Sequence, residues 1–184
     1  GLGDVYKRQY LVRAVLDASD QTARQGMMYA ATLSGVAFGN GGCHLPHAMS
    51  YPVAGMVRDF QPCGYPTDEP ICPHGMSVIV NAPAAYRFTS ASAPERHFEG
   101  ATLLGADTTD AVPLEAGEVL AEHLGKMMQQ TEMPYGVGGV GFDEADINDL
   151  VAGALAQERL LSVSPREVGE EDLHNIFSSA LRYW

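Results

Sequence analysis

The chain has 184 residues, with 11 Lys and Arg against 23 Asp and Glu, which gives a formal net charge of −12 at pH 7. Hydrophobic residues make up 46% and charged residues 18%, a composition typical of a folded domain and not of a disordered chain. The acidic charge argues against nucleic-acid binding and against docking on an anionic membrane surface. No stretch reaches the roughly 18 apolar residues that a membrane-spanning helix needs. We therefore expect neither nucleic acid nor a membrane as a partner.

The first nine residues, 1–9, differ from the rest of the chain, because a helical pattern of apolar residues begins only at Tyr10. They resemble the translated sequencing-adaptor tails found at the ends of assembled environmental reads. We therefore expect residues 1–9 to be a non-native leader and residues 10–184 to be part of a helical domain.

Apolar residues recur at helical spacing along most of the chain, and no segment shows a convincing strand pattern. The helix with the fewest charges, 21–38, is expected to be buried on most sides. Pro52 and Pro83 should bend the helices that contain them. A loop rich in proline and glycine is expected over 58–72. The sequence thus predicts an all-α orthogonal helical bundle, with helices over 10–19, 21–38, 43–57, 73–88, 94–104, 113–128, 143–155 and 170–181.

The six histidines fall into two groups. Three lie among charged residues of amphipathic helices, where we expect them on the surface: His97, His123 and His174. Three others lie in apolar, glycine-rich surroundings, where a neutral ring needs a partner for each nitrogen: His44, His47 and His74. A metal ion is one such partner, and a protein hydrogen-bonding group in the core is the other. The spacing leaves both interpretations open.

Two motifs carry a family resemblance. Residues 35–55 read GVAFGNGGCHLPHAMSYPVAG, and Pro73-His74-Gly75 follows, with His74 27 residues after His47. The first motif resembles the C-terminal signature of iron-containing alcohol dehydrogenases, and the second resembles the next motif of that family. Four features are closest to its hydroxyacid–oxoacid transhydrogenase branch: Tyr51 in place of a second histidine, His44 before the ligand position, the 27-residue step, and the segments 94–97 and 104–108.

The resemblance implies a helical metal-binding domain of the dehydroquinate synthase-like type. In that family one aspartate and three histidines bind a divalent metal, usually iron and sometimes zinc, and His47 and His74 match two of those ligands. The other two ligands, an Asp and a His one helical turn apart, have no match in this sequence. The N-terminal nucleotide-binding domain of the family, which mainly binds NAD(P), has no match in this sequence either. We therefore expect residues 10–184 to be a partial domain that is inactive by itself.

The branch implies hydride transfer from a 4- or 3-hydroxyacid to 2-oxoglutarate through a bound nicotinamide cofactor. Carboxylate substrates need cationic partners, best supplied by arginine. Arg58 and Arg87 follow the helices of His47 and His74 and are candidate substrate-binding residues, with a solvated arginine at a helix end as the alternative. Tyr51, one turn beyond His47, is a candidate catalytic residue, with a core tyrosine as the alternative.

Two other functions remain open: an NAD(P)-dependent iron-type alcohol dehydrogenase, or a non-catalytic helical module if the short chain is complete. The family further implies a homo-oligomer, cytoplasmic in a microbe or in the mitochondrial matrix of an animal. The three cysteines are too few and too scattered for a disulfide scaffold and favour a reducing compartment. Residues 136–141 spell G-x-G-x-x-G without a preceding strand, so we interpret them as a flexible connector and not as a phosphate loop.

Overall fold

The computed structural model describes residues 2–184, and every regular element in this range is helical. The all-α prediction is therefore confirmed. The α-helices are α1 (Leu2–Leu16), α2 (Gln21–Gly41), α3 (Leu45–Gly55), α4 (His74–Ile79), α5 (Ala82–Thr89), α6 (Pro94–Leu104), α7 (Ala116–Gln130), α8 (Ile147–Leu155), α9 (Glu158–Leu161) and α10 (Glu170–Ala180). Short 3-10 helices are η1 (Ser90–Ser92), η2 (Pro113–Glu115), η3 (Val137–Val140) and η4 (Glu144–Asp146).

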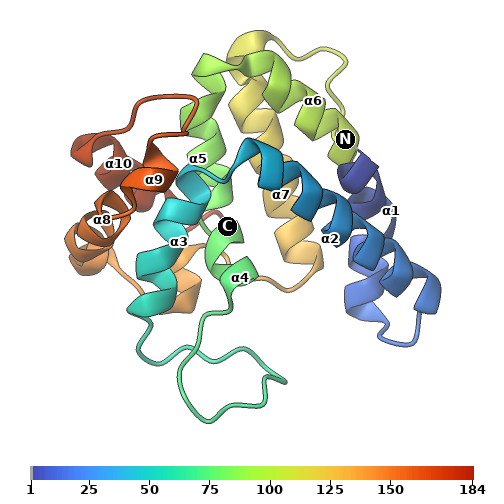
Figure 1. The fold of residues 1–184 in the computed structure, drawn as a ribbon, viewed down its shortest axis with the longest axis horizontal. Helices are drawn as coiled ribbons and strands as arrows, with labels where there is room; N and C mark the ends of the chain where they lie inside the picture. The colour runs from blue at the N-terminus through green and yellow to red at the C-terminus, as the bar shows by residue number, and fades with distance from the viewer. Residues whose placement is uncertain (1) are drawn as a thin grey trace.

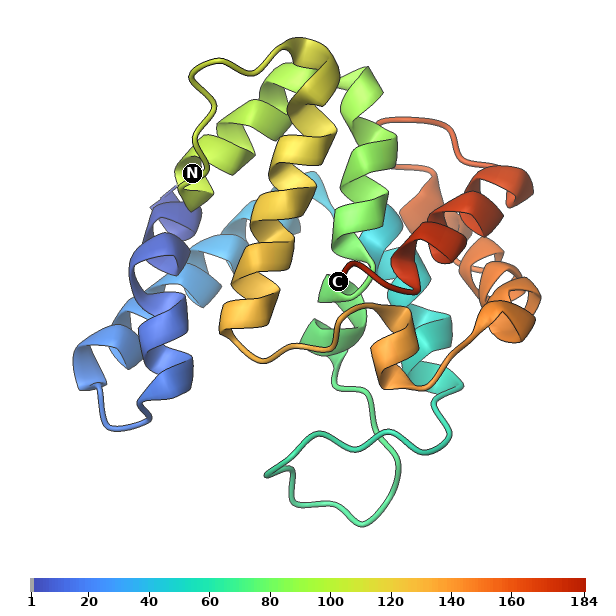
Figure 2. The same cartoon turned by 180° about the vertical axis from the view of Figure 1, so that it is seen from behind.

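The helix axes run in several directions, as expected for an orthogonal bundle (Figure 1). The α1–α2 pair lies at one end of the molecule and α8, α9 and α10 lie at the other, with α4 to α7 between them (Figures 1 and 2). The C-terminus ends beside α4 and α5 in both views. A long loop joins α3 to α4 at the edge of the bundle, where the proline-rich loop was predicted.

The main hydrophobic core lies beneath α3 and is shared by α4, α5, α7, α8 and α10. Apolar residues four apart along α3 point into it, and Leu45, Met49 and Val53 are fully buried. α8 and α10 contribute their own helical stripes, from which Leu150 and Phe177 are fully buried. These amphipathic helices form where the sequence predicts them because each has one apolar face to bury.

The prediction that the helix over 21–38 is buried on most sides is wrong. α2 packs mainly against α1, and its buried residues are Ala23, Gly26 and Ala30. Met28 is 70% exposed and Tyr29 is 64% exposed. The low charge of this helix predicted burial, but within the described residues its only extensive contact is with α1, on one side.

Two predicted boundaries also differ. α1 begins at Leu2 and not at Tyr10, so residues 2–9 of the expected leader continue this helix; Gly1 lies outside the described residues. The helix predicted over 73–88 is divided into α4 and α5. Pro83 explains the division in part, because its ring nitrogen has no hydrogen to donate to the carbonyl four residues earlier.

The glycine-rich segment 136–141 is not a flexible connector, which corrects the prediction. It forms η3, whose Val137 and Val140 are buried against the core. Gly136 lies directly against the end of α10, where a Cβ would be 2.4 Å from the carbonyl oxygen of Ala180. Its φ of +148° is one that L side chains rarely adopt. The segment therefore serves close packing of the C-terminal residues.

None of the helices in the described range is long and apolar enough to cross a membrane.

Candidate metal centre

α3 places His47 on the side of the helix away from the main core. The stripe Leu45, Met49 and Val53 is fully buried, whereas His47 is half-buried and Tyr51, one turn later, is 50% exposed. The Ser50 hydroxyl donates a hydrogen bond to the His47 carbonyl oxygen at 2.8 Å, which adds a side-chain contact to this turn. The helical period thus assigns packing and site residues to opposite faces of one element.

α4 places His74 at its first position. Pro73 precedes the helix with extended backbone angles (φ −56°, ψ 146°), and the Ser77 amide donates to the Pro73 carbonyl at 2.9 Å. The Ser77 hydroxyl donates to the His74 carbonyl at 2.8 Å, and the side-chain amide of Asn81 donates to the Ser77 carbonyl at 2.7 Å. Short polar side chains therefore stabilise a helix of only six residues.

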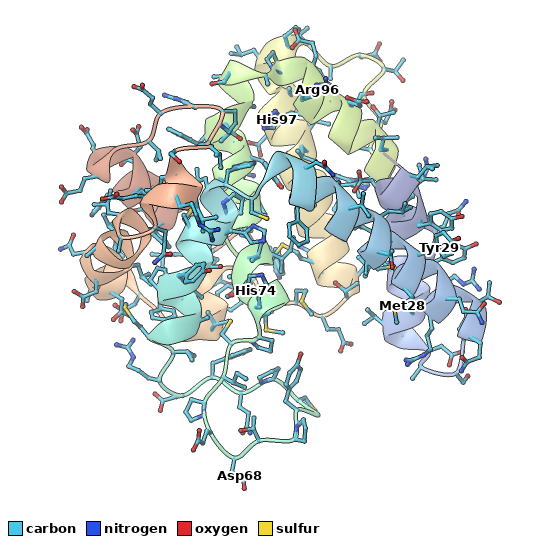
Figure 3. The ribbon with its side chains drawn as sticks, in the orientation of Figure 1. Met28, Tyr29, Asp68, His74, Arg96 and His97 are labelled. Carbon is cyan, nitrogen blue, oxygen red and sulfur yellow. The ribbon has the colours of Figure 1, made fainter. Side chains whose placement is uncertain are left out.

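The two imidazoles face one another across α3 and α4, with ring centroids 5.3 Å apart and ring planes inclined by 55°. Figure 3 labels His74 on α4, next to α3. A nitrogen about 2.1 Å from a divalent ion puts the ring centre about 3.2 Å from it, so two rings separated by about 110° around one ion have centres about 5.3 Å apart. The observed separation fits two histidine ligands of one ion.

Burial and the nearby His74 lower the pKa of His47 below its usual value, so its ring is neutral at pH 7. A neutral ring offers a nitrogen lone pair, as metal binding requires. Among residues 2–184, no group of three or more His, Cys, Asp or Glu side chains is placed to hold a metal ion. The described residues thus bring together two candidate ligands, and a tighter site would need further donors.

His44 lies just before α3 and lines a cavity of about 790 Å³ with residues of α1 and of α4 to α7. Its ring packs edge-on against Tyr86 at 6.4 Å, and Tyr86 packs edge-on against His97 at 5.9 Å. The Nδ1 atom of His44 is buried without a hydrogen-bonding partner. Burial, then the neighbouring His47 and His97, lower the pKa of His44 and keep its ring neutral.

The prediction that His97 is a surface residue is wrong, because it is 7% exposed. Its Nδ1 lies 2.8 Å from the Ala93 carbonyl and its Nε2 lies 3.0 Å from the Thr89 hydroxyl. The sequence held a signal for this: Ala101 and Leu104 recur four and seven residues after His97, which puts the histidine on the apolar face of α6. Of the other two, His174 is exposed, and half-buried His123 lies 3.0 Å from the Leu104 carbonyl.

Tyr51 is not a core residue, since half of its surface is accessible. It lies on the same face of α3 as His47, and its catalytic role stays a prediction. Tyr86 and Thr89, which complete the cavity beside His44, were missed by sequence reasoning. They lie in a helix read as an ordinary apolar one, and nothing in their spacing singles them out.

Both candidate arginines are engaged by protein carboxylates. Arg58 makes two 2.8 Å hydrogen bonds to Asp146, and Arg87 makes bonds of 2.6 and 2.7 Å to Glu118. Hydrogen bonding to these arginines lowers the pKa of both carboxyls. Pairing with a carboxylate favours a structural role for each arginine, and substrate binding by either stays a prediction.

The chain is similar to known proteins over most of its length. Residues 8–181 match the model of the Fe-containing alcohol dehydrogenase family, C-terminal. The chain is 42% identical over 176 residues to "Hydroxyacid-oxoacid transhydrogenase, mitochondrial" of Bos taurus and of Homo sapiens, covering 96% of this chain and 38% of each relative. It is 40% identical over 170 residues to the "Probable hydroxyacid-oxoacid transhydrogenase, mitochondrial" of Dictyostelium discoideum, covering 92% of this chain and 31% of that protein.

The chain thus spans well under half the length of the curated relatives it matches. Among solved structures, a 1,3-propanediol oxidoreductase superposes with a TM-score of 0.84 at 25% identity, over 97% of this chain and 43% of that one. An alcohol dehydrogenase from Oenococcus oeni shares the fold, with a TM-score of 0.85 at 23% identity and the same coverage. The chain therefore belongs to the Fe-containing alcohol dehydrogenase family, whose C-terminal part it matches.

Proposed function

We propose that this chain is the metal-binding helical part of an oxidoreductase of the hydroxyacid–oxoacid transhydrogenase type, with His47 and His74 as two ligands of a divalent metal, iron in the first place and zinc as the alternative. The single observation that carries the proposal is the 5.3 Å separation of their ring centres. The relatives at 40–43% identity support the transhydrogenase type.

When bound, the metal would supply Lewis acidity to a substrate hydroxyl or carbonyl oxygen. The chain's own residues orient the ligands and shape the surroundings. His47 is held by α3, packed on the main core, and His74 by the short α4. The cavity beside His44 is lined by neither His47 nor His74, so the proposal rests on the two helices that hold these rings.

Tyr51 has a different place in the proposal. It lies one turn after His47 on the same face of α3, and half of its surface is accessible. We propose that Tyr51 contacts the substrate or takes part in a relay that carries the substrate's proton to solvent. A nicotinamide cofactor, NAD(P), would be bound mainly by parts of the full-length protein outside these residues. The substrates proposed are a 4- or 3-hydroxyacid as hydride donor and 2-oxoglutarate as acceptor.

The metal assignment is tested by titrating the purified chain with Co²⁺ and recording both heat and visible absorption. We expect His47→Ala and His74→Ala each to weaken Co²⁺ binding at least tenfold, because each removes one of two imidazole ligands. His174→Ala is the matched control, since His174 is exposed on α10, and it should stay within twofold of the parent. Equal affinity of all four proteins would refute the metal assignment.

The activity is tested in a full-length protein that carries this domain. Turnover of a hydroxyacid should require an oxoacid acceptor if the cofactor stays bound between the two half-reactions. Steady release of free NADH without any oxoacid would instead indicate an NAD(P)-dependent alcohol dehydrogenase. Retained turnover after His74→Ala would refute both.

A further inference from the structure

The junction between α4 and α5 is interrupted in an unusual way. In a continuous helix the Ala84 amide would donate to the Val80 carbonyl, and residue 83 would donate to Ile79. Pro83 has no N–H, so the second of these bonds cannot form. The Ala84 amide donates to the hydroxyl oxygen of Tyr183 at 3.3 Å, and this hydroxyl donates to the Val80 carbonyl at 2.9 Å. A side chain about 100 residues away is thus inserted into the helical hydrogen-bond pattern.

Tyr183 is well placed to keep this bridge. Burial raises the pKa of its hydroxyl, so the proton that it donates to Val80 is retained at any physiological pH. The Arg87 guanidinium lies over its ring at 5.9 Å. The backbone amide of Tyr183 donates to the Tyr135 carbonyl at 2.9 Å, and the Gly138 amide donates to the Leu181 carbonyl at 3.0 Å. The C-terminal segment is therefore anchored on the glycine-rich turn η3.

The bridge acts at the end of the helix that carries His74. A helix of six residues is far too short to be stable by itself, so α4 depends on what its ends contact. Its first residue is His74, and its last carbonyl groups lead to Val80, where the Tyr183 hydroxyl binds. A change in the direction of α4 at Val80 is transmitted over less than two turns to the ring of His74.

We propose that Tyr183 is a positioning residue for the candidate ligand His74: its hydroxyl fixes the α4–α5 junction and so keeps the His74 ring at the ligand distance from His47. This inference rests on the proposed function, because it matters only if His74 binds metal. It gives the C-terminal residues a role in the site without any contact with the metal or the substrate.

The test compares Tyr183→Phe, which removes the hydroxyl and keeps the ring, with the matched control Tyr135→Phe, which removes the hydroxyl of a tyrosine at the surface. The 184-residue chain is used throughout. Amide hydrogen exchange by NMR reports the junction, Co²⁺ titration reports the site, and circular dichroism reports the fold. We expect Tyr183→Phe to keep its helical signal, to speed exchange at Ala84 at least tenfold, and to weaken Co²⁺ binding at least fivefold. The control should stay within twofold in both measurements.

Faster exchange at Ala84 with unchanged Co²⁺ affinity would overturn the proposal, because Tyr183 would then have only a structural role. Equal Co²⁺ affinity of the parent and His74→Ala would show that the proposed function has failed, and the positioning role with it. The two failures are distinguishable, since only the first leaves a His74-dependent site. If Tyr183→Phe loses its helical signal, Tyr183→Trp is measured instead, because its indole keeps an N–H donor for the Val80 carbonyl. Recovery of Co²⁺ binding while the helical signal stays low would support the positioning role. Co²⁺ binding that only follows the helical signal would overturn it.

Discussion

Replacing Gly136 by alanine should destabilise the chain strongly, although it adds one methyl group. The new Cβ would lie 2.4 Å from the carbonyl oxygen of Ala180 and 2.8 Å from that of Leu181, and both are backbone atoms that a rotamer change cannot move. A φ of +148° adds backbone strain of about 1–3 kcal/mol for an L residue. Overpacking in a well-packed region costs about 1–3 kcal/mol more. The two together predict a loss of at least about 2 kcal/mol.

Urea unfolding followed by circular dichroism measures this loss, and the matched control is Gly39→Ala. Gly39 lies inside α2, where a Cβ would meet no atom within 4 Å. Alanine there should stabilise the helix by up to about 1 kcal/mol, because glycine is a poor helix former. The same methyl group is thus expected to have opposite effects at the two positions. A Gly136→Ala protein as stable as the parent would refute the close approach of η3 to the C-terminal segment.

Three further predictions concern charge and reactivity. A double-mutant cycle on Arg87→Ala and Glu118→Ala should give a coupling energy of about 0.5–1 kcal/mol, since the pair is half exposed; a coupling of zero would contradict the two-bond geometry. An NMR titration should show the pKa of the Asp146 carboxyl below its ordinary, unfolded-state value, because Arg58 binds the charged form. The carboxyl therefore stabilises the fold above its unfolded-state pKa, and this contribution is lost as pH falls through the folded-state pKa. Arg58→Ala should raise the folded-state pKa, and an unchanged pKa would argue against the ion pair. Exposed Cys63 should react with iodoacetamide at pH 8 much faster than Cys72, whose burial raises its pKa to about 11, and similar rates would show that Cys72 is not buried.

The sequence is most informative where one helix has one clear apolar face. α6 has the predicted bounds, and α10 differs by one residue, because proline or acidic residues mark their starts and an apolar stripe continues to their ends. The division of α4 from α5 was not predictable in full. Pro83 is visible in the sequence, but the bridge that the Tyr183 hydroxyl makes between Ala84 and Val80 comes from the far end of the chain.

The candidate site shows the same limit. The spacing of His44, His47 and His74 indicates histidines in unusual surroundings, and the structure brings His47 and His74 together across two helices. The sequence cannot indicate that Arg58 is paired with Asp146, because 88 residues separate them and the pairing depends on tertiary packing. Burial of α2 was mispredicted for a related reason. A low charge shows that a helix can be buried, but its actual burial depends on which helices pack against it.

The α1–α2 pair has a consequence for cooperativity. No residue of α1 is buried, α2 buries only small residues, and neither helix contributes to the hydrophobic core clusters. The pair is therefore connected to the rest of the molecule, mainly to α6, by few apolar contacts. Such a unit opens at a lower free energy than the core, as a separate subglobal step. His47 and His74 both belong to helices outside this pair. Mass action by any ion bound between them would raise the melting temperature of α3 to α10 and leave the opening of α1 and α2 where it was.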